Sequence, residues 1–215
     1  MALQSGRRRL DIGRLIMVPA FAGILVADSF ALDNGTHGAA GVLQTLGAVL
    51  VVAFYALVIW CYLRRGPALA TSGSVTAHAA AIAATWLPFA LPLLHGTPPG
   101  QARQALADVL LIFGMAWAVW PLRFLGRNVS VLAQARGLAE QGPYRWVRHP
   151  LYAGEIVSSL GLTIAVNSYA AFGLWLALCG LQIYRALREE QVLLRALPAY
   201  RAYRSRTAAL LPGVF

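Results

Sequence analysis

The sequence predicts an all-α protein, a polytopic transmembrane helical bundle of about six spans, with five as the alternative. Three observations predict this fold class. The 215-residue chain is 59% hydrophobic and only 12% charged, whereas about a quarter of a soluble domain is charged. Its apolar residues form runs long enough to cross a bilayer, and its arginines gather between these runs.

Four apolar runs have the length of about 20 residues that a bilayer-spanning helix needs. They cover residues 13–32, 39–63, 76–95 and 105–125, each bounded by Gly, Pro, Asn or Arg. Arg7, Arg8 and Arg9 precede the first run as in a signal peptide, but that run is long and further spans follow, so we expect a retained first helix. Residues 1–125 are thus a predicted four-helix transmembrane scaffold.

The apolar stretch over residues 151–187 is too long for one span and is interrupted at Asn167-Ser168, which predicts a helical hairpin. Its first arm, residues 151–166, is short for a full crossing, and five spans therefore remain possible. A cytoplasmic amphipathic C-terminal helix is expected after the hairpin.

The arginines predict the topology, because cytoplasmic loops collect basic residues. A cytoplasmic N-terminus puts 17 of the 18 arginines inside and only Arg103 outside. The outer connections, around Asn34-Gly35, Gly96-Gly100 and Asn167-Ser168, are otherwise uncharged apart from Asp33. Six spans with both termini cytoplasmic fit best, and the expected location is a bacterial inner membrane.

The net charge of +10 and the pI near 10.6 are typical of some nucleic-acid-binding proteins. Here the arginines lie in short clusters between apolar runs, which topology explains, so no nucleic-acid partner is expected. The two cysteines, Cys61 and Cys179, lie inside apolar runs without the spacing of a zinc site. No metal is expected.

A polar and aromatic cluster precedes the hairpin. Pro150 keeps His149 out of helical geometry and suits the first turn of a helix, so Arg148 and His149 are expected at a helix N-terminus, where unpaired N–H groups favour an anion. Glu155 follows in the second turn, and an ionisable side chain inside a span is a functional candidate. The alternative is that Glu155 pairs with Arg145 or Arg148.

A second cluster lies at the end of the outgoing hairpin arm. Arg185 and Glu189 are four residues apart and share a helix face, while Glu190 is turned by about 100°. Taken alone, this second cluster is expected to be an exposed helix end with salt bridges. Because a hairpin returns its second arm beside the start of the first, we expect both glutamates to face Tyr152 and the Arg-His pair before it.

A pocket between the two clusters would have cationic, anionic and aromatic walls. S-adenosylmethionine suits such walls, because carboxylates and aromatic faces hold its cationic parts and Arg, His and helix N–H groups hold its carboxylate. Another dipolar cofactor suits them as well.

The combined pattern resembles the integral membrane methyltransferases of the isoprenylcysteine carboxyl methyltransferase family and the related phospholipid N-methyltransferases. The matching residues are Gly142-Pro143-Tyr144, Arg148-His149-Pro150, Tyr152, Glu189-Glu190 with Leu193, Tyr200-Arg201-Ala202-Tyr203 and Pro212-Gly213. The resemblance covers residues 126–215, and the first four helices match only in being apolar. Leu197-Pro198 departs from the Phe-Gly often found in the family, and Ala199 replaces an acidic residue.

The resemblance implies S-adenosylmethionine bound on the cytoplasmic side of residues 126–215 and a lipophilic small-molecule or lipid-modified acceptor that enters from the bilayer, among membrane lipids. The candidate cofactor-binding residues, from the pocket and the resemblance together, are Tyr144, Arg148, His149, Pro150, Tyr152, Glu155, Glu189, Glu190 and Tyr200. The candidate catalytic residues are Glu189, Glu190, Arg201 and Arg204. Either arginine would orient a carboxylate acceptor, and either glutamate would accept the proton of an amine.

The expected function is carboxyl O-methylation, with N-methylation of a phospholipid or another amine as the alternative. A membrane sterol reductase that uses NADPH is a second alternative, because such an enzyme need not have a dinucleotide fingerprint. A third alternative is a non-catalytic membrane module, in which the arginines contact lipid phosphates. The sequence does not identify the acceptor or the oligomeric state.

Overall fold

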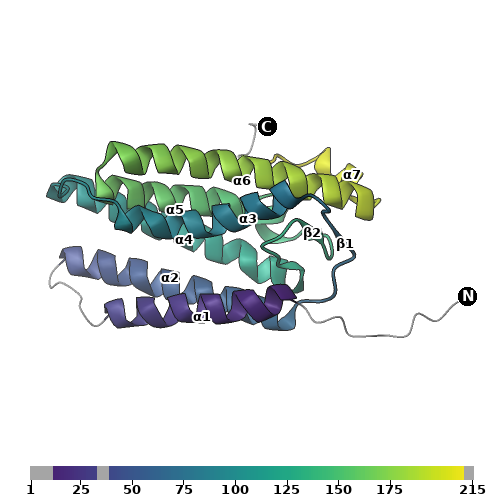
Figure 1. The fold of residues 1–215 in the computed structure, drawn as a ribbon, viewed down its shortest axis with the longest axis horizontal. Helices are drawn as coiled ribbons and strands as arrows, with labels where there is room; N and C mark the ends of the chain where they lie inside the picture. Colours follow the sequence, from purple (N-terminus) through teal and green to yellow (C-terminus); the bar gives the residue numbers. More distant parts are fainter. Residues whose placement is uncertain (1–11, 33–38, 211–215) are drawn as a thin grey trace, which may run out of the picture.

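The computed structural model describes residues 12–32 and 39–210, which form helices that run alongside one another (Figure 1). Three features of the sequence analysis lie outside these residues: the N-terminal Arg7, Arg8 and Arg9, the connection around Asp33, Asn34 and Gly35, and the Pro212-Gly213 pair. The main helices are α1 (Ile12–Leu32), α2 (Ala39–Arg64), α3 (Val75–Trp86), α4 (Gln101–Leu125), α5 (Pro150–Val166), α6 (Tyr169–Ala196) and α7 (Tyr200–Arg204). Short 3-10 helices are η1 (Leu87–Leu93), η2 (Gly126–Asn128) and η3 (Gly142–Arg145).

Four helical segments of the described chain are long and apolar enough to cross a membrane. They are Gly41–Arg64, Val75–Leu93, Gln101–Asn128 and Tyr169–Ala196. Two further apolar segments, Gly13–Val26 and Pro150–Val166, are shorter. The chain is therefore an integral membrane protein built of helices, as predicted, while the count of six spans stays a prediction.

The third predicted span is not one continuous α-helix. The α-helix ends at Trp86, and the chain continues as η1, with Pro88 at its start and Pro92 within it. Proline lacks the N–H that an α-helix needs and collides with the preceding turn. The two prolines therefore explain why the apolar run over 76–95 changes its helix type halfway.

Helix α4 lies between α2 and α5 and packs most extensively against α5. Glycines allow this approach: a Cβ on Gly114 would lie 2.3 Å from the amide nitrogen of Ser158, and one on Gly154 would lie 2.8 Å from the amide nitrogen of Ala118. Small residues let membrane helices pack at short distance. This contact fixes α5, and with it the hairpin, against the N-terminal helices.

The helical hairpin of α5 and α6 turns where the sequence predicts. Asn167 ends α5 in the left-handed conformation, with φ 53° and ψ 55°, which asparagine tolerates better than most residues. The Ser168 side chain then accepts a hydrogen bond from the amide of Ala170 and caps α6. The two arms thus run side by side in opposite directions (Figure 1).

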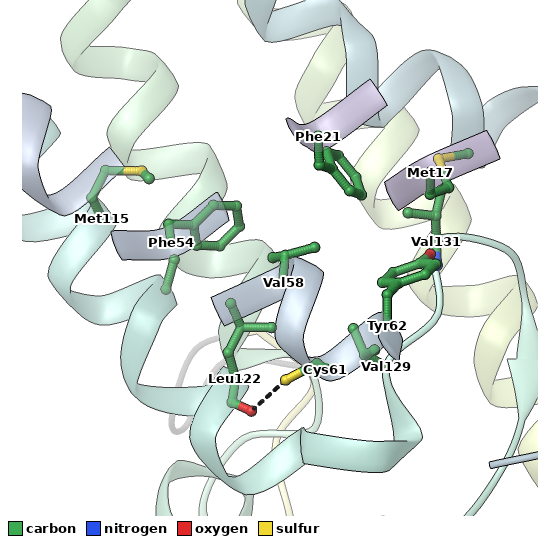
Figure 2. Close-up of a cluster of buried hydrophobic side chains, with 11 residues drawn as sticks. Met17, Phe21, Phe54, Val58, Cys61, Tyr62, Met115, Leu122, Val129 and Val131 are labelled. Atoms are coloured by element: carbon green, nitrogen blue, oxygen red, sulfur yellow. Dashed lines mark hydrogen bonds between the residues drawn. The ribbon is translucent and has the colours of Figure 1, made fainter. Parts of the chain in front are cut away.

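A cluster of buried apolar side chains joins α1, α2, α4 and the loop after η2 (Figure 2). Phe21 contacts Tyr62 edge to face at 6.0 Å between ring centroids. The hydroxyl of Tyr62 accepts a hydrogen bond from the amide of Val131 at 2.7 Å. This cluster therefore anchors the loop that leads to the polar segment before α5.

The ends of the helices that carry most of the basic residues lie together. Arg14 donates to the carbonyl oxygen of Arg65 at 3.0 Å, and the amide of Gly66 donates to the carbonyl oxygen of Arg127 at 3.3 Å. The loop between η2 and η3 and the end of α6 reach the same end of the bundle (Figure 1). We call it the arginine-rich end.

Two details differ from the all-α prediction. A two-stranded antiparallel ribbon, β1 (Ala70–Thr71) with β2 (Gln134–Ala135), covers part of the arginine-rich end. The expected C-terminal amphipathic helix is only the five residues of α7. After α7 the chain turns, and Ala208 forms a parallel bridge with Val147.

Candidate functional site

The start of α5 has the geometry that the sequence predicts. His149 is the residue before the helix, with φ −123° and ψ 54°, and Pro150 occupies the first turn. The indole nitrogen of Trp117 on α4 donates to the carbonyl oxygen of Pro150 at 2.9 Å. The helix start is therefore held in place from the neighbouring helix.

The C-terminal segment lies along the residues that precede α5. The amides of Arg148 and His149 donate to the carbonyl oxygens of Ala208 and Ala209 at 2.8 and 2.9 Å, and the amide of Ala208 donates to Trp146 at 3.0 Å. Arg148 and His149 thus precede the helix as predicted, but their own N–H groups are not free for an anion, and the anion site at the helix start stays a prediction. Backbone pairing with the C-terminal segment uses both groups.

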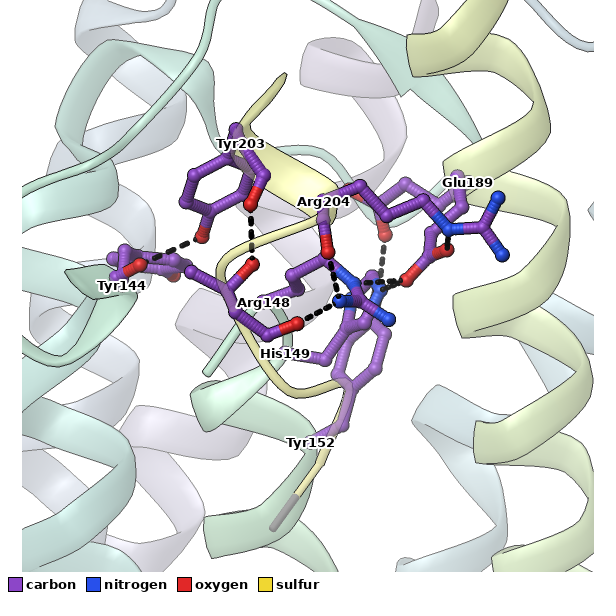
Figure 3. Close-up of polar contacts among 9 residues, drawn as sticks. Tyr144, Arg148, His149, Tyr152, Glu189, Tyr203 and Arg204 are labelled. Atoms are coloured by element: carbon purple, nitrogen blue, oxygen red, sulfur yellow. Dashed lines mark hydrogen bonds and ion pairs between the residues drawn. The ribbon is translucent and has the colours of Figure 1, made fainter. Parts of the chain in front are cut away.

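Glu190 of α6 is the centre of a buried ionic cluster and is only 4% exposed. Figure 3 shows its partners Arg148, His149 and Arg204 close together. Its Oε1 accepts from Nε of Arg148 at 2.6 Å and lies 3.3 Å from Nε2 of His149, and its Oε2 lies 3.0 Å from Nε of Arg204. Arg148 also donates to the carbonyl oxygens of Arg204 and Thr207. Charge-assisted bonds of this kind are strong, so one carboxylate links α5, α6 and α7.

Tyr152 connects the ionic cluster to the membrane part of α6. Its hydroxyl donates to Oε2 of Glu189 at 2.6 Å. The imidazole of His149 stacks on its ring at 5.3 Å between centroids and 8° between planes, and the guanidinium of Arg185 lies 4.6 Å from the ring centroid. The predicted meeting of Glu189 and Glu190 with Arg148, His149 and Tyr152 is thus seen in the structure.

Three buried tyrosines surround the cluster. Tyr203 donates to the carbonyl oxygen of Tyr144 at 2.8 Å (Figure 3). The hydroxyl of Tyr200 is buried and has no hydrogen-bond partner among the described residues. Burial raises the pKa of all three hydroxyls, so they stay protonated at neutral pH. Tyr200 therefore keeps an unused hydrogen-bonding group beside the ionic cluster.

The two arginines predicted to orient the acceptor occupy different positions. Arg204 is half exposed and contacts Glu190. Arg201 is exposed on the outer surface of α7, and no side-chain contact to the cluster is seen for it within the described chain. Only Arg204 is therefore part of the cluster.

Glu155 does not pair with Arg145 or Arg148, so that alternative for its role is wrong. Its Oε2 accepts from Nε2 of Gln182 on α6 at 2.6 Å. Gln182 itself is fully buried, and its Oε1 has no hydrogen-bond partner in the described part of the molecule. Glu155 thus lies apart from the ionic cluster, one turn further along α5 than Tyr152.

A chamber of about 270 Å³ lies between the helices, with Glu155 and Arg185 in its wall. Ligand pockets typically measure about 300–1,000 Å³. Its other polar residues include Ser130, Ser158 and Ser159. Its apolar wall comes from α1, α2, η1 and α4 and includes Phe21, Phe54, Tyr55, Phe89, Leu111 and Met115. Because Arg185 also stacks on Tyr152, the chamber and the ionic cluster are neighbours.

Sequence reasoning missed Gln182 and the chamber. Gln182 is three residues before Arg185 and so shares its helix face, a signal that could have included it. No such signal marks the chamber wall, because the aromatic and aliphatic residues of the first four helices are indistinguishable from packing residues in the sequence. Their common cavity exists only in the folded bundle.

The fold and site together define a polytopic membrane protein in which a buried polar cluster at one end of the bundle adjoins an apolar chamber. The family model of phospholipid methyltransferases matches residues 102–199. This range includes all but the first residue of α4, the whole of α5 and α6, and the ionic cluster except Arg204. None of the curated proteins matches the chain.

Among solved structures, the chain is similar to the eukaryotic intramembrane Ras methyltransferase, isoprenylcysteine carboxyl methyltransferase. The match has a TM-score of 0.52 at 17% sequence identity and covers 96% of this chain and 87% of the other. The two chains thus share a fold. Both comparisons confirm that this chain resembles the integral membrane methyltransferases, as its Arg-His-Pro and Glu-Glu motifs indicate.

Proposed function

We propose that the chain is an S-adenosylmethionine-dependent methyltransferase that acts on a lipophilic acceptor. The observation that carries this proposal is the position of the Glu190 cluster directly beside the apolar chamber. A polar cofactor and a lipophilic acceptor need two such compartments in contact. The match of residues 102–199 to the phospholipid methyltransferase family supports the same reading.

The side chains around the cluster fit the proposed cofactor. The buried hydroxyl of Tyr200 and the Nε of Arg185 have no hydrogen-bond partner among residues 12–32 and 39–210. A bound molecule would satisfy both groups, and unsatisfied buried polar groups are costly. Glu189 and the stacked rings of His149 and Tyr152 suit the cationic parts of the cofactor. Tyr144, Arg148, Pro150 and Glu190 would hold this wall in shape.

When bound, S-adenosylmethionine supplies an electrophilic methyl group on a positively charged sulfur. The protein then has to align the nucleophile with that group and exclude water. Tyr152, fixed by His149, Glu189 and Arg185, would form the boundary between the two compartments. The tightly packed helices around the chamber would keep water out.

The first candidate reaction is carboxyl O-methylation of an isoprenylcysteine, with N-methylation of a phospholipid or another amine as the alternative. In the first case Arg204 would orient the acceptor carboxylate from the rim of the cluster, together with Arg201 if α7 turns. The apolar chamber would receive a prenyl chain or a small amphipathic molecule. Both termini would be cytoplasmic, with the arginine-rich end inside.

Calorimetric titration of the purified full-length protein tests the cofactor. We expect S-adenosylhomocysteine, the product of methyl transfer, to bind with a dissociation constant in the micromolar range, about −8 kcal/mol, and NADPH not to bind. Binding of NADPH alone would favour the reductase alternative. Binding of neither compound would favour a non-catalytic membrane module.

A further inference from the structure

Glu155 is an acidic side chain in the wall of an otherwise largely apolar chamber. It lies on α5, inside an apolar helix of 17 residues, and lines the chamber together with Leu151, Ser158 and Leu162. Ionisable residues at such positions are costly and face functional cavities. The position therefore needs an explanation beyond packing.

The contacts of Glu155 leave much of its hydrogen-bonding capacity unused. A carboxylate has about four acceptor positions, and the Gln182 amide is the one side-chain donor that reaches it among the described residues. None of the ion pairs within 4.0 Å in the described chain includes Glu155. Glu155 is thus able to accept a further hydrogen bond from a molecule in the chamber.

The other two glutamates of the region are less suited to receive a proton from an acceptor. Glu190 already contacts Arg148, His149 and Arg204, and cationic partners favour the charged form of a carboxylate. Glu189 accepts the hydroxyl proton of Tyr152 and does not line the chamber. Glu155 is the one carboxylate in the wall of this chamber as described.

We propose that Glu155 accepts a proton from the methyl acceptor, and that the chamber therefore selects a lipophilic molecule whose nucleophile carries an N–H or O–H group. This inference rests on the proposed methyl transfer, and it favours an amine or hydroxyl acceptor over the carboxylate of the O-methylation case. A carboxylate acceptor would bring a second negative charge beside Glu155, and Arg185 is the one cation that the described chamber wall offers to balance the two. An amine or hydroxyl would instead donate to it.

The proposed step is balanced. The lone pair of the acceptor nitrogen or oxygen forms a bond to the methyl carbon, and the bond between that carbon and the sulfonium sulfur breaks with its electrons going to sulfur. The proton of the nucleophile moves to a carboxylate oxygen of Glu155. The positive charge of Arg185, in the same wall, would favour the ionised form of Glu155 before the step.

Binding of three amphiphiles of equal chain length tests the selectivity without the cofactor. The full chain in phosphatidylcholine nanodiscs is titrated with dodecylamine, dodecanol and dodecanoate, and apparent dissociation constants are measured. We expect the wild type to bind the amine and the alcohol at least about tenfold more tightly than the carboxylate, a difference that a single retained hydrogen bond can supply. Equal or tighter binding of dodecanoate would overturn the proposal.

Substitution of Glu155 tests the residue. Glu155→Gln is expected to weaken dodecylamine binding about tenfold, and Glu155→Asp, which keeps the charge, is expected to retain most of the preference. Glu140→Gln is the matched control, because Glu140 is a surface residue paired with Arg206, and it should bind all three probes as the wild type does. Unchanged amine binding in Glu155→Gln would contradict the assignment. If Glu155→Gln does not fold, the wild-type ranking of the three probes and their binding to Glu155→Asp still test the proposal.

Turnover separates this proposal from the proposed function. With labelled S-adenosylmethionine, Glu155→Gln should lower kcat for an amine or hydroxyl acceptor and leave KM for the cofactor unchanged. A raised KM for the cofactor would place Glu155 in the cofactor site and overturn the proposal. Methylation of lipophilic carboxylates at the same rate by wild type and Glu155→Gln would overturn it too, with the methyltransferase function intact. Absence of any transfer would reject the function itself, independently of the amphiphile ranking.

Discussion

Tyr200 and Tyr203 are one helical turn apart, yet their hydroxyl groups have different environments. Tyr203 donates to the backbone of Tyr144, whereas the buried hydroxyl of Tyr200 has no partner in the described chain. Tyr200 is close enough to Glu190 and Arg148 for their charges to act on it. One hydroxyl thus stabilises the fold, while the other is available for a ligand.

Replacing each tyrosine by phenylalanine separates these two roles. Tyr200→Phe should leave thermal stability unchanged and weaken S-adenosylhomocysteine binding by about 0.5–1.5 kcal/mol, the net value of one hydrogen bond. Tyr203→Phe, the control, should lower the melting temperature, because it leaves the buried carbonyl of Tyr144 without its donor. Titration calorimetry and thermal melts measure both. Reduced stability with unchanged affinity in Tyr200→Phe would show that its hydroxyl has no ligand.

At the residue scale the sequence predicts which charged residues come together better than it predicts the individual hydrogen bonds. The hairpin argument brings Glu190 to Arg148 and His149 correctly, because helix periodicity and the Asn167-Ser168 break fix the register of the two arms. The bond from Gln182 to Glu155 was not foreseen, because only the spacing of Gln182 from Arg185 marks this uncharged residue. The backbone contacts of the C-terminal segment were not foreseen either.

The hairpin is held against the rest of the bundle by the packing of α5 on α4. Gly114, Gly154 and Gly161 meet backbone atoms of the neighbouring helix at distances that exclude a side chain. Because Glu155 and Tyr152 lie on α5 near these contacts, the position of the site depends on this packing. The energetic support of the site therefore lies within the membrane.

A single added methyl group tests this dependence. Gly114→Ala would place its Cβ 2.3 Å from the amide nitrogen of Ser158, so the helices must separate, at a cost of about 1–3 kcal/mol. Gly173→Ala on α6 is the matched control, because no atom lies within 4 Å of the position of its Cβ. Thermal melts in detergent should show a lower midpoint only for Gly114→Ala. Equal midpoints for both variants would contradict the role assigned to the α4 and α5 contact.

At the element scale the sequence predicts most helix boundaries within a few residues. Apolar run length and the flanking Gly, Pro and Asn residues suffice for α2, α4 and the hairpin. The change to a 3-10 helix at Pro88 has a local cause in the two prolines, whereas the pairing of Ala208 with Val147 depends on a tertiary contact. No pattern within either segment reports a partner about sixty residues away.

For the whole molecule, the chamber unites the two predicted parts of the chain. Residues from the first four helices supply most of its apolar wall, and α5 and α6 supply Glu155 and Arg185. The sequence analysis assigns the chemistry to residues 126–215 and treats residues 1–125 as a scaffold, a division that stays a prediction. The lining of the chamber indicates that the N-terminal helices would determine which acceptor fits.

The most direct test of the account is transfer of label from methyl-labelled S-adenosylmethionine into a lipid extract, with the full-length protein in nanodiscs. Wild type and the surface control Glu140→Gln should both produce a labelled organic-phase product. Glu190→Gln weakens the contacts to Arg148, His149 and Arg204. It should reduce the label at least about tenfold, as expected for loss of charged hydrogen bonds worth about 1.5–3 kcal/mol. No labelled product with the wild type, or equal labelling with Glu190→Gln, would contradict the account.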